Sequence, residues 1–525
     1  MRSKHFLGLL LTASAAVVAV SSGCGGDVDE TGNGGRGGDG GDTTMSTTTT
    51  TGTTMTTSTG STGGMGGTGG MGGMGACAGD KDGNCDTATA EPIEINDMAP
   101  IEGDLEPVDE DEDFFTFEGT AGQALFIYTD AKQPPDEFSN DYADLVITLY
   151  DANGTRIAEN DDPTPRNTND SEIYTILPSD GTYYVRVEEC STWAAQNNLP
   201  DTSCAPAGDI LDTSYKLAIF ELDPAIPSVV IEDKAMDIAN PASAAAMEYE
   251  PGQMAGTYII STNAGFFKDA MDKDYFSFTV PVDDPATMGA TEGIKLTPTE
   301  RLVGYFNFPP PGDLGNGSTS PLGLISIIDP MTMQVYAQVD GATATEMSPP
   351  LTVGKEYLLE MAAPASGGDF AGNPFYFVLH NGGGSNPVEK ELQAGMTPNN
   401  TTVTAEVLVK AMGQQSYFVE GDITGAPVDI DYFKVAVPAG LNVVSIACGA
   451  QRSGSGLSGF KATLLGADGM TMVGTATEAA DKDLFIQNAA VPSGAAELFV
   501  RLEAAGQNVA VTSSFYRCGI HFNMM

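Results

Sequence analysis

The sequence predicts an all-β protein: three tandem jelly-roll-like antiparallel β-sandwich domains after a disordered Thr/Gly/Ser/Met-rich linker. Three observations support this fold class. A short acidic and aromatic motif occurs at Asp111, Asp272 and Asp429, at intervals of 161 and 157 residues. The segments after each copy alternate apolar and polar residues with the period of a strand. The 63 glycines and 31 prolines interrupt these segments every few residues, as turns between short strands do.

The chain begins with the order of a secretory signal, which is basic residues, an apolar run and then small residues. Arg2, Lys4 and His5 precede the apolar stretch 6–20. That stretch has about 15 residues, whereas a membrane-spanning helix needs about 20. We therefore predict a signal peptide over residues 1–23 and export of the remaining chain.

Cys24 follows Ser21-Ser22-Gly23 and resembles the lipidated cysteine of bacterial lipoproteins. This resemblance implies a membrane anchor at Cys24 and a place at the cell envelope, with the outer membrane or cell surface favoured. Ser21 departs from the Leu that lipoproteins prefer three residues before the cysteine. An ordinary signal cleaved nearby, and secretion of the protein, are the alternatives.

Residues 24–76 form the predicted disordered tether, and residues 43–76 contain only Thr, Ser, Gly, Met and Ala. Such a segment has no apolar face whose burial could offset the entropy of ordering the chain. As a flexible coil it spans roughly 40 Å.

The charge of the chain limits its partners. With 23 Lys+Arg against 71 Asp+Glu, the formal net charge is −48, so the protein repels phosphates and nucleic acid is excluded as a partner.

The repeated motif is Asp-x-Asp followed by two aromatic residues, and it covers 111–117, 272–278 and 429–435. Each copy is followed by an apolar segment with a turn (145–154, 324–330, 462–469), an aromatic segment (181–187, 354–360, 496–502) and a closing strand (215–220, 375–380, 518–522). Intervals this long indicate tandem domains rather than a solenoid. The predicted domains are 77–223, 224–384 and 385–525, with short helices expected at 235–247 and 401–412.

Six cysteines follow Cys24. Pairing each with its nearest neighbour in the same domain gives Cys77–Cys85, Cys190–Cys204 and Cys448–Cys518. Six cysteines allow 15 connectivities, of which this is the simplest, and an oxidising compartment favours such bridges.

The motifs of the first domain resemble the bacterial pre-peptidase C-terminal domain. The resemblance rests on DEDFF at 111–115, LVITLYDANG at 145–154, NDD at 160–162 and LPSDGTYYV at 177–185. It implies a jelly-roll-like sandwich, found beside secreted bacterial peptidases and related to the collagen-binding modules of clostridial collagenases. The third domain matches in part, whereas the second lacks the Asn-Asp-Asp element and has an insertion at 282–321. No peptidase domain accompanies these modules here.

The resemblance also implies a calcium site in the first domain, because related modules bind calcium through acidic and Asn residues of the entering strand and an Asp-x-Asp pair. The candidate ligands are Glu94, Asn96, Asp97, Asp111 and Asp113. Calcium takes six to eight oxygen ligands, which such a cluster can supply. Domains two and three lack the Asn-Asp element. The alternative is a solvated acidic face with Asp113 capping a turn. No other cofactor is expected.

No catalytic residue is predicted. Only His380 and His521 follow the signal, both in closing strands, and no HExxH, G-x-S-x-G or P-loop occurs. We therefore expect a non-catalytic exported protein, tethered to a membrane by its N-terminal lipid, with a binding, adhesion or accessory role toward an extracellular or envelope polymer or protein. The alternatives are a secreted hydrolase with an unrecognised carboxylate pair in a pocket, and a purely structural stalk.

Overall fold

The computed structural model describes residues 83–97, 99–108, 111–131, 143–161, 170–197, 204, 210, 212–233, 238–248, 250–251, 257–280, 301–308, 318–344, 346–365, 370, 374–383, 388–392, 397–410, 416–424, 428–479 and 483–524. This part of the chain is almost entirely β-structure, with one α-helix, α2 (Cys190–Gln196). No helix in these ranges has the length and apolar character needed to cross a membrane. The predicted signal, Cys24, the tether and Cys77 lie outside the described residues.

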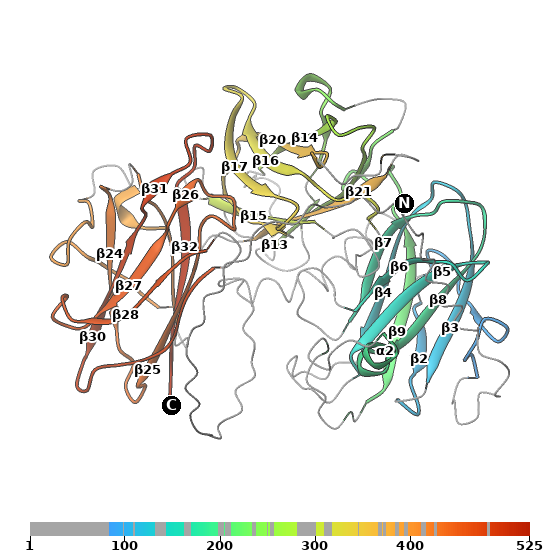
Figure 1. The fold of residues 1–525 in the computed structure, drawn as a ribbon, viewed down its shortest axis with the longest axis horizontal. Helices are drawn as coiled ribbons and strands as arrows, with labels where there is room; N and C mark the ends of the chain where they lie inside the picture. Colours follow the sequence, from blue (N-terminus) through green and yellow to red (C-terminus); the bar gives the residue numbers. More distant parts are fainter. Residues whose placement is uncertain are drawn as a thin grey trace, which may run out of the picture. The chain divides into compact units, whose positions relative to one another are not determined.

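The first sandwich packs a five-stranded sheet on a four-stranded sheet (Figure 1). The five-stranded sheet has the order β1 (Glu91–Pro92), β3 (Glu112–Gly119), β8 (Gly181–Glu189), β5 (Leu145–Asp151), β6 (Arg156–Asn160). The four-stranded sheet has the order β2 (Ile101–Asp104), β9 (Ser214–Glu221), β4 (Ala124–Ala131), β7 (Glu172–Ile176). Only β1 and β3 pair in parallel. The alternating residues Phe115, Phe117, Val185 and Val187 meet in the core between the two sheets, as their period of two predicts.

The second sandwich repeats this arrangement. Its five-stranded sheet has the order β11 (Ala245–Ala246), β14 (Lys273–Thr279), β20 (Glu356–Ala362), β16 (Leu324–Asp329), β17 (Gln334–Asp340). Its other sheet has the order β10 (Val229–Ile231), β13 (Thr257–Phe266), β21 (Phe375–Gly383), β15 (Arg301–Asn307), β18 (Glu346–Met347), with β12 (Glu250–Pro251) on β13 and β19 (Pro350–Thr352) on β15.

The third sandwich has the same strand orders as the first. Its five-stranded sheet runs β22 (Glu406–Val407), β24 (Ile430–Ala436), β30 (Glu497–Glu503), β27 (Lys461–Leu465), β28 (Met472–Thr477). Its four-stranded sheet runs β23 (Ser416–Asp422), β32 (Phe515–Asn523), β25 (Val443–Gly449), β29 (Leu484–Ala490). A two-stranded ribbon of β26 (Leu457–Ser458) and β31 (Gly506–Gln507) completes it. The prediction of an all-β protein with three tandem antiparallel sandwiches is confirmed.

In every sandwich the Asp-x-Asp strand, β3, β14 or β24, lies second in the five-stranded sheet, beside a short parallel edge strand. The helices expected at 235–247 and 401–412 are therefore wrong. The described residues of these segments contain the edge strands β11 and β22 and a single 3₁₀ turn, η2 (Pro241–Ser243). Backbone pairing with β14 overrides the local helix preference of the Ala-rich segment 235–247, whereas the many Thr and Val residues of 401–412 themselves favour a strand.

Neighbouring sandwiches share apolar cores. Phe126, Tyr174 and Phe220 of the first sandwich form one buried cluster with Phe266 and Phe377 of the second. Phe515, at the start of β32 in the third sandwich, is fully buried in the core of the second. The sandwiches are thus joined by side-chain packing as well as by the chain.

Two of the predicted disulfides are confirmed, Cys190–Cys204 and Cys448–Cys518. The second one joins residues that stand opposite each other in β25 and β32. Cys85 is also disulfide-bonded.

Candidate metal centre

Each sandwich contains the same buried hydrogen bond between the second aspartate of its Asp-x-Asp motif and a tyrosine of the sheet that packs against the five-stranded sheet. The phenol donates to the carboxylate in Tyr215–Asp113 (2.5 Å), Tyr376–Asp274 (2.8 Å) and Tyr516–Asp431 (2.7 Å). Each tyrosine stands opposite a glycine in the sheet, namely Gly103, Gly265 and Gly421. A Cβ on any of these glycines would come within 2.4 Å of the phenol oxygen, so only glycine leaves room for this bond.

In the third sandwich this hydrogen bond belongs to a larger carboxylate cluster. Carboxylate oxygens of Glu391, Asp429 and Asp431 all lie within 4.8 Å of one another. This separation is about twice the 2.3–2.6 Å of a calcium–oxygen bond, so one ion can contact all three. Glu389 is fully buried beside them, and its Oε2 lies 3.0 Å from the Tyr516 hydroxyl, which can share its proton between Glu389 and Asp431.

The cluster is held by backbone contacts from three segments. Glu389 lies just before the sandwich, where its N–H donates to the Glu420 carbonyl of β23 (2.8 Å) and its Oε1 accepts from the Asp422 N–H (2.8 Å). Asp429 and Asp431 flank the first residue of β24, and Asp429 accepts from the Thr424 N–H (2.7 Å). The sheets therefore fix these carboxylates at one end of the sandwich.

Two asparagine amides complete the cluster. With their amide nitrogens facing the carboxylates, Asn399 donates to Asp431 (2.9 Å) and Asn400 donates to Asp429 (2.9 Å). The Asn399 nitrogen also lies 3.3 Å from the Glu391 carboxylate, so this amide links two of the three carboxylates.

The electrostatics of the cluster favour either protons or a cation. Burial raises the pKa of Glu389, and the Asp431 carboxylate raises it further. Burial likewise raises the pKa of Asp431, with Asp429 and Glu391 adding to the shift. Within the described part of the chain, no ion pair links these four carboxylates to a Lys or Arg. A bound cation would supply the missing positive charge, and every donor in the set is an oxygen, which suits Ca²⁺ or Mg²⁺ rather than Zn²⁺.

The predicted ligands of the first sandwich are not brought together. Asp111 and Asp113 lie at the start of β3, where Asp113 accepts from Tyr215 and Asp111 accepts from the Glu106 N–H (2.8 Å). The parallel register aligns Glu91 with Phe115. Glu94, three residues later, therefore lies toward the end of β3 that is far from Asp111 and Asp113.

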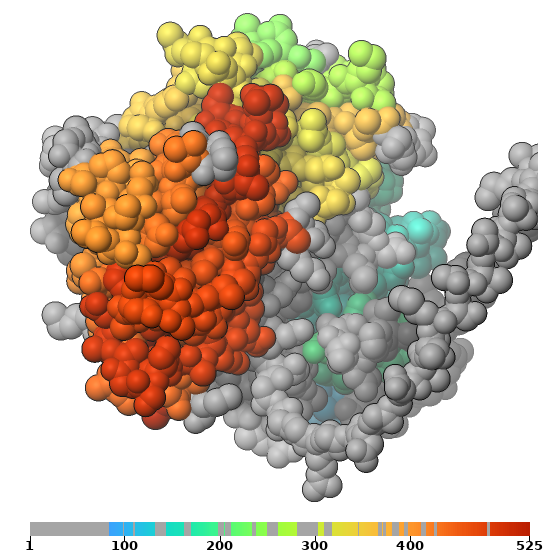
Figure 2. Space-filling model, turned by 60° about the vertical axis from the view of Figure 1, so that its left-hand side comes forward, coloured from blue at the N-terminus to red at the C-terminus, as the bar shows by residue number. Residues whose placement is uncertain are grey.

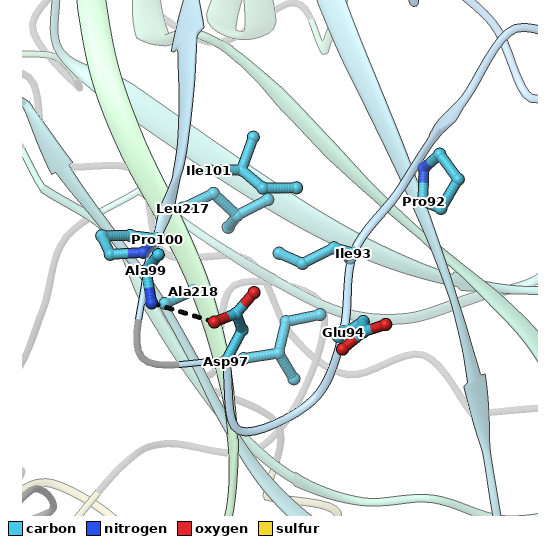
Figure 3. Close-up of a pocket in the computed structure, with 10 residues that line it drawn as sticks. Pro92, Ile93, Glu94, Asp97, Ala99, Pro100, Ile101, Leu217 and Ala218 are labelled. Atoms are coloured by element: carbon cyan, nitrogen blue, oxygen red, sulfur yellow. Dashed lines mark hydrogen bonds between the residues drawn. The ribbon is translucent and has the colours of Figure 1, made fainter.

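There, Asn96 accepts from the Glu221 N–H (2.9 Å), and Asp97 accepts from the Ala99 N–H (3.0 Å). Glu94 and Asp97 line a cavity of about 210 Å³ whose apolar lining includes Ile93, Ile101 and Leu217 (Figure 3). This volume is below the 300–1,000 Å³ of typical small-molecule pockets. The backbone register therefore separates the five predicted ligands into two groups.

The amide that belongs with Asp111 and Asp113 is Asn84, which sequence reasoning missed. The carbonyl of Asn84 accepts from the N–H of Phe114 (2.8 Å), and the carbonyl of Asn399 accepts from the N–H of Tyr432 (3.1 Å), so the two asparagines are equivalent. Asn84 is 3% exposed. The third sandwich has no Asn-Asp pair, as expected, and Asn399 and Asn400 stand before its motif instead.

The second sandwich has lost this amide. The equivalent carbonyl, which accepts from the Tyr275 N–H (3.1 Å), belongs to Ile238, a buried core residue. Glu232 corresponds to Glu389, since it accepts from the Phe266 N–H (2.8 Å) as Glu389 does from Asp422. Among the described residues of this sandwich, no three ligands gather within the reach of one ion.

Both histidines lie where the sequence placed them, in closing strands. His380 of β21 is buried, and its ring stacks on Phe306 with 3.8 Å between ring centroids. Burial holds the pKa of His380 well below its usual value. His521 of β32 has its Nδ1 2.7 Å from the Ser416 hydroxyl.

Comparison with known proteins identifies a family for one segment. Residues 111–189 match the bacterial pre-peptidase C-terminal domain. This range covers the Asp-x-Asp strand through β8 of the first sandwich. No curated protein matches the chain.

Several solved structures resemble the chain at a low level. The CUB1-EGF-CUB2 domain of human MASP-1/3 is 10% identical, covers 53% of this chain and 98% of its own, and has a TM-score of 0.14. A triple jelly-roll protein of an archaeal virus turret is 12% identical, covers 78% and 81%, and has a TM-score of 0.15. The CBM22 tandem domain of Xyn10C from Paenibacillus barcinonensis is 10% identical, covers 51% and 82%, and has a TM-score of 0.13. Scores this low support no conclusion about function.

Proposed function

We propose that the protein is a non-catalytic binding protein made of three pre-peptidase C-terminal-like modules, the third of which holds a calcium ion. The family match of residues 111–189 supports the module assignment for the first sandwich. The shared strand order and the repeated tyrosine–aspartate hydrogen bond support it for the other two. The single observation that carries the calcium proposal is the buried, oxygen-only cluster around Asp431.

The ion would be held by the carboxylates of Glu391, Asp429 and Asp431. It would supply the positive charge that allows these carboxylates to ionise together. Glu389 and Tyr516 would hold the ligands in place, because the tyrosine hydroxyl contacts both Glu389 and Asp431. The site is part of the frame of the sandwich, so its role is to stabilise the module and the surface that the module presents.

A non-catalytic role is supported by how the cluster uses its hydrogen bonds. Tyr516, Asp422 and Thr424 donate to its carboxylates, which leaves the acids engaged in structural contacts. A general acid or base needs a substrate proton within hydrogen-bond reach instead. The shared cores between sandwiches also favour a second candidate function, a stiff stalk that spaces one partner from another.

The test of the calcium proposal is a melting curve of the full chain with calcium or with EDTA. A ligand at 100 times its dissociation constant stabilises by about 2.7 kcal/mol, which is a readily measured shift. We expect calcium to raise the melting temperature of the wild type and of the surface variant Glu497→Gln, but not of Asp431→Asn. An unchanged melting temperature of the wild type in excess EDTA would disprove the calcium site.

The envelope anchor is a separate part of the proposal and rests on the sequence around Cys24. Growth in labelled palmitate should label the wild type and a Cys85→Ser variant but not Cys24→Ser. Labelling that survives Cys24→Ser contradicts lipidation at this residue. Fractionation of the same cells would show whether the protein is at the envelope or secreted, and pull-downs on envelope polymers would search for its partner.

A further inference from the structure

The first residues of β32 face two different sandwiches in turn. Tyr516 points into the carboxylate cluster of the third sandwich, where its hydroxyl contacts Asp431 and Glu389. Phe515, one residue before it, is fully buried in the core of the second sandwich. Arg517, one residue after it, donates to the Ser348 carbonyl of the second sandwich. This alternation follows from the period of two of a β-strand.

The strand therefore belongs to a joint between the two sandwiches as well as to the cluster. The Arg517 guanidinium also lies 5.6 Å from the ring centre of Tyr305, a residue of β15. The Arg452 guanidinium of the third sandwich pairs with Glu346 of the second at 2.8 Å. Through these contacts, Arg452, Phe515 and Arg517 of the third sandwich pack against the second.

Backbone hydrogen bonds tie the same joint together. The N–H groups of Thr512 and Ser513 donate to the carbonyls of Val335 (2.9 Å) and Tyr336 (3.1 Å), and residues 511 and 335 form a parallel bridge. In the opposite direction, the Gln338 N–H of the second sandwich donates to the Gly454 carbonyl (3.0 Å). Figure 2 shows red residues from near the C-terminus against yellow residues of the second sandwich. One continuous stretch, 511–517, thus runs from the joint into the cluster.

Tyr516 has little freedom to move independently of its neighbours. Its ring stacks on Phe460, with 5.4 Å between ring centroids, and a Cβ at Gly421 would already clash with its phenol oxygen. A strand rises about 3.3 Å per residue, so a shift of the Tyr516 backbone is passed directly to residues 515 and 517. Three of the acids around this phenol, Glu389, Asp429 and Asp431, are buried, and a cation among their ionised carboxylates would draw them together.

From this geometry we infer that cation binding in the third sandwich and docking of the third sandwich on the second are thermodynamically linked through β32. The inference rests on the proposed calcium site and adds its regulation: occupancy tightens the joint, and a formed joint raises the affinity for the ion. Linkage of this kind is reciprocal, so both directions can be measured.

Hydrogen exchange on the full chain tests the first direction. The reporters are the joint amides of Gln338, Thr512 and Ser513, none of which belongs to the cluster. We expect calcium to slow their exchange at least fivefold in the wild type and to leave it unchanged in Asp431→Asn. Amides of the first sandwich, such as that of Val185, serve as an internal control and should not respond.

Calcium titration tests the reciprocal direction. Phe515→Ala removes the phenylalanine ring from the joint and should lower the calcium affinity at least fivefold. Phe278→Ala removes an equally large ring from the same core at a position outside β32, so it should leave the affinity unchanged. If Phe515→Ala does not fold, the hydrogen-exchange measurement on the wild type still tests whether calcium binding and the joint are linked.

The two proposals fail in different ways. A wild type that binds no calcium refutes the site itself. A wild type that binds calcium without slowing exchange at the joint, or a Phe515→Ala variant with the affinity of Phe278→Ala, refutes the linkage and leaves the site intact.

Discussion

Gly421→Ala is the smallest change that should disable the candidate metal centre. An ideal Cβ on Gly421 would lie 2.2 Å from the Tyr516 phenol oxygen and 2.7 Å from the Glu389 carboxyl carbon. Real Cβ atoms essentially never approach closer than 3.0 Å, so the phenol must shift by about 0.8 Å. Because Phe460 also stacks on this ring, we expect the shift to break the hydrogen-bond contacts of the phenol with Asp431 and Glu389.

The magnitude follows from these two effects. Overpacking a core by one methyl group typically costs about 1–3 kcal/mol, and losing a hydrogen bond to a charged group costs about 1.5–3 kcal/mol. We therefore expect the free energy of unfolding of the third sandwich to fall by about 3–5 kcal/mol. At roughly 3 °C per kcal/mol for a domain of this size, its melting temperature should fall by about 10 °C or more.

Differential scanning calorimetry of the full chain and calorimetric calcium titration measure both consequences. Gly466→Ala is the matched control, because its nearest contact would be 3.5 Å away, at the Asp468 carboxylate. We expect this control to melt within about 1 °C of the wild type and to bind calcium normally. If Gly421→Ala has the melting temperature and calcium affinity of Gly466→Ala, the reasoning from the Gly421–Tyr516 contact is refuted.

Two further predictions concern pH and covalent cross-links. Because the pKa values of Glu389 and Asp431 are raised in the folded protein, the stabilisation from their protonated forms is present at acid pH and is lost as the pH rises through these raised values. In EDTA the melting temperature of the third sandwich should fall from pH 5 to pH 9 more steeply in the wild type than in Asp431→Asn. Calcium should abolish this difference in slope. Equal slopes in EDTA would contradict the raised pKa values. Replacing Cys448 and Cys518 by Ala opens a loop with a sequence separation of 70 and should cost about 4 kcal/mol in urea unfolding, whereas an unchanged midpoint contradicts a stabilising bridge.

Much of the fold was predictable from local patterns. The period of two in segments such as 181–187 specifies which residues enter a core, and glycine, proline and aspartate mark where strands end. The threefold recurrence of Asp-x-Asp specifies the number of sandwiches. The disulfides Cys190–Cys204 and Cys448–Cys518 followed from spacing, because each pair falls within one repeat.

The candidate site was less predictable because its members are distant in sequence. Asn96 stands in a family-like stretch, yet Asn84 is the residue whose carbonyl pairs with Phe114. The distance of each asparagine before its motif was the available signal, since Asn84 and Asn399 precede Asp113 and Asp431 by similar intervals. A two-residue edge strand such as β1 could pair with β3 in more than one register, and no local pattern in the sequence shows which register forms.

The sequence by itself determined the recurring strands of each sandwich and the side of each that is buried, because these depend on side chains a few residues apart. The tertiary structure decided which carboxylates meet and which sandwich each aromatic residue enters. Tyr516 and Phe515 show the reason, since adjacent residues of one strand point to opposite faces and so enter two different cores. The contacts that a residue makes therefore depend on which sheet or neighbouring sandwich covers its face of the strand.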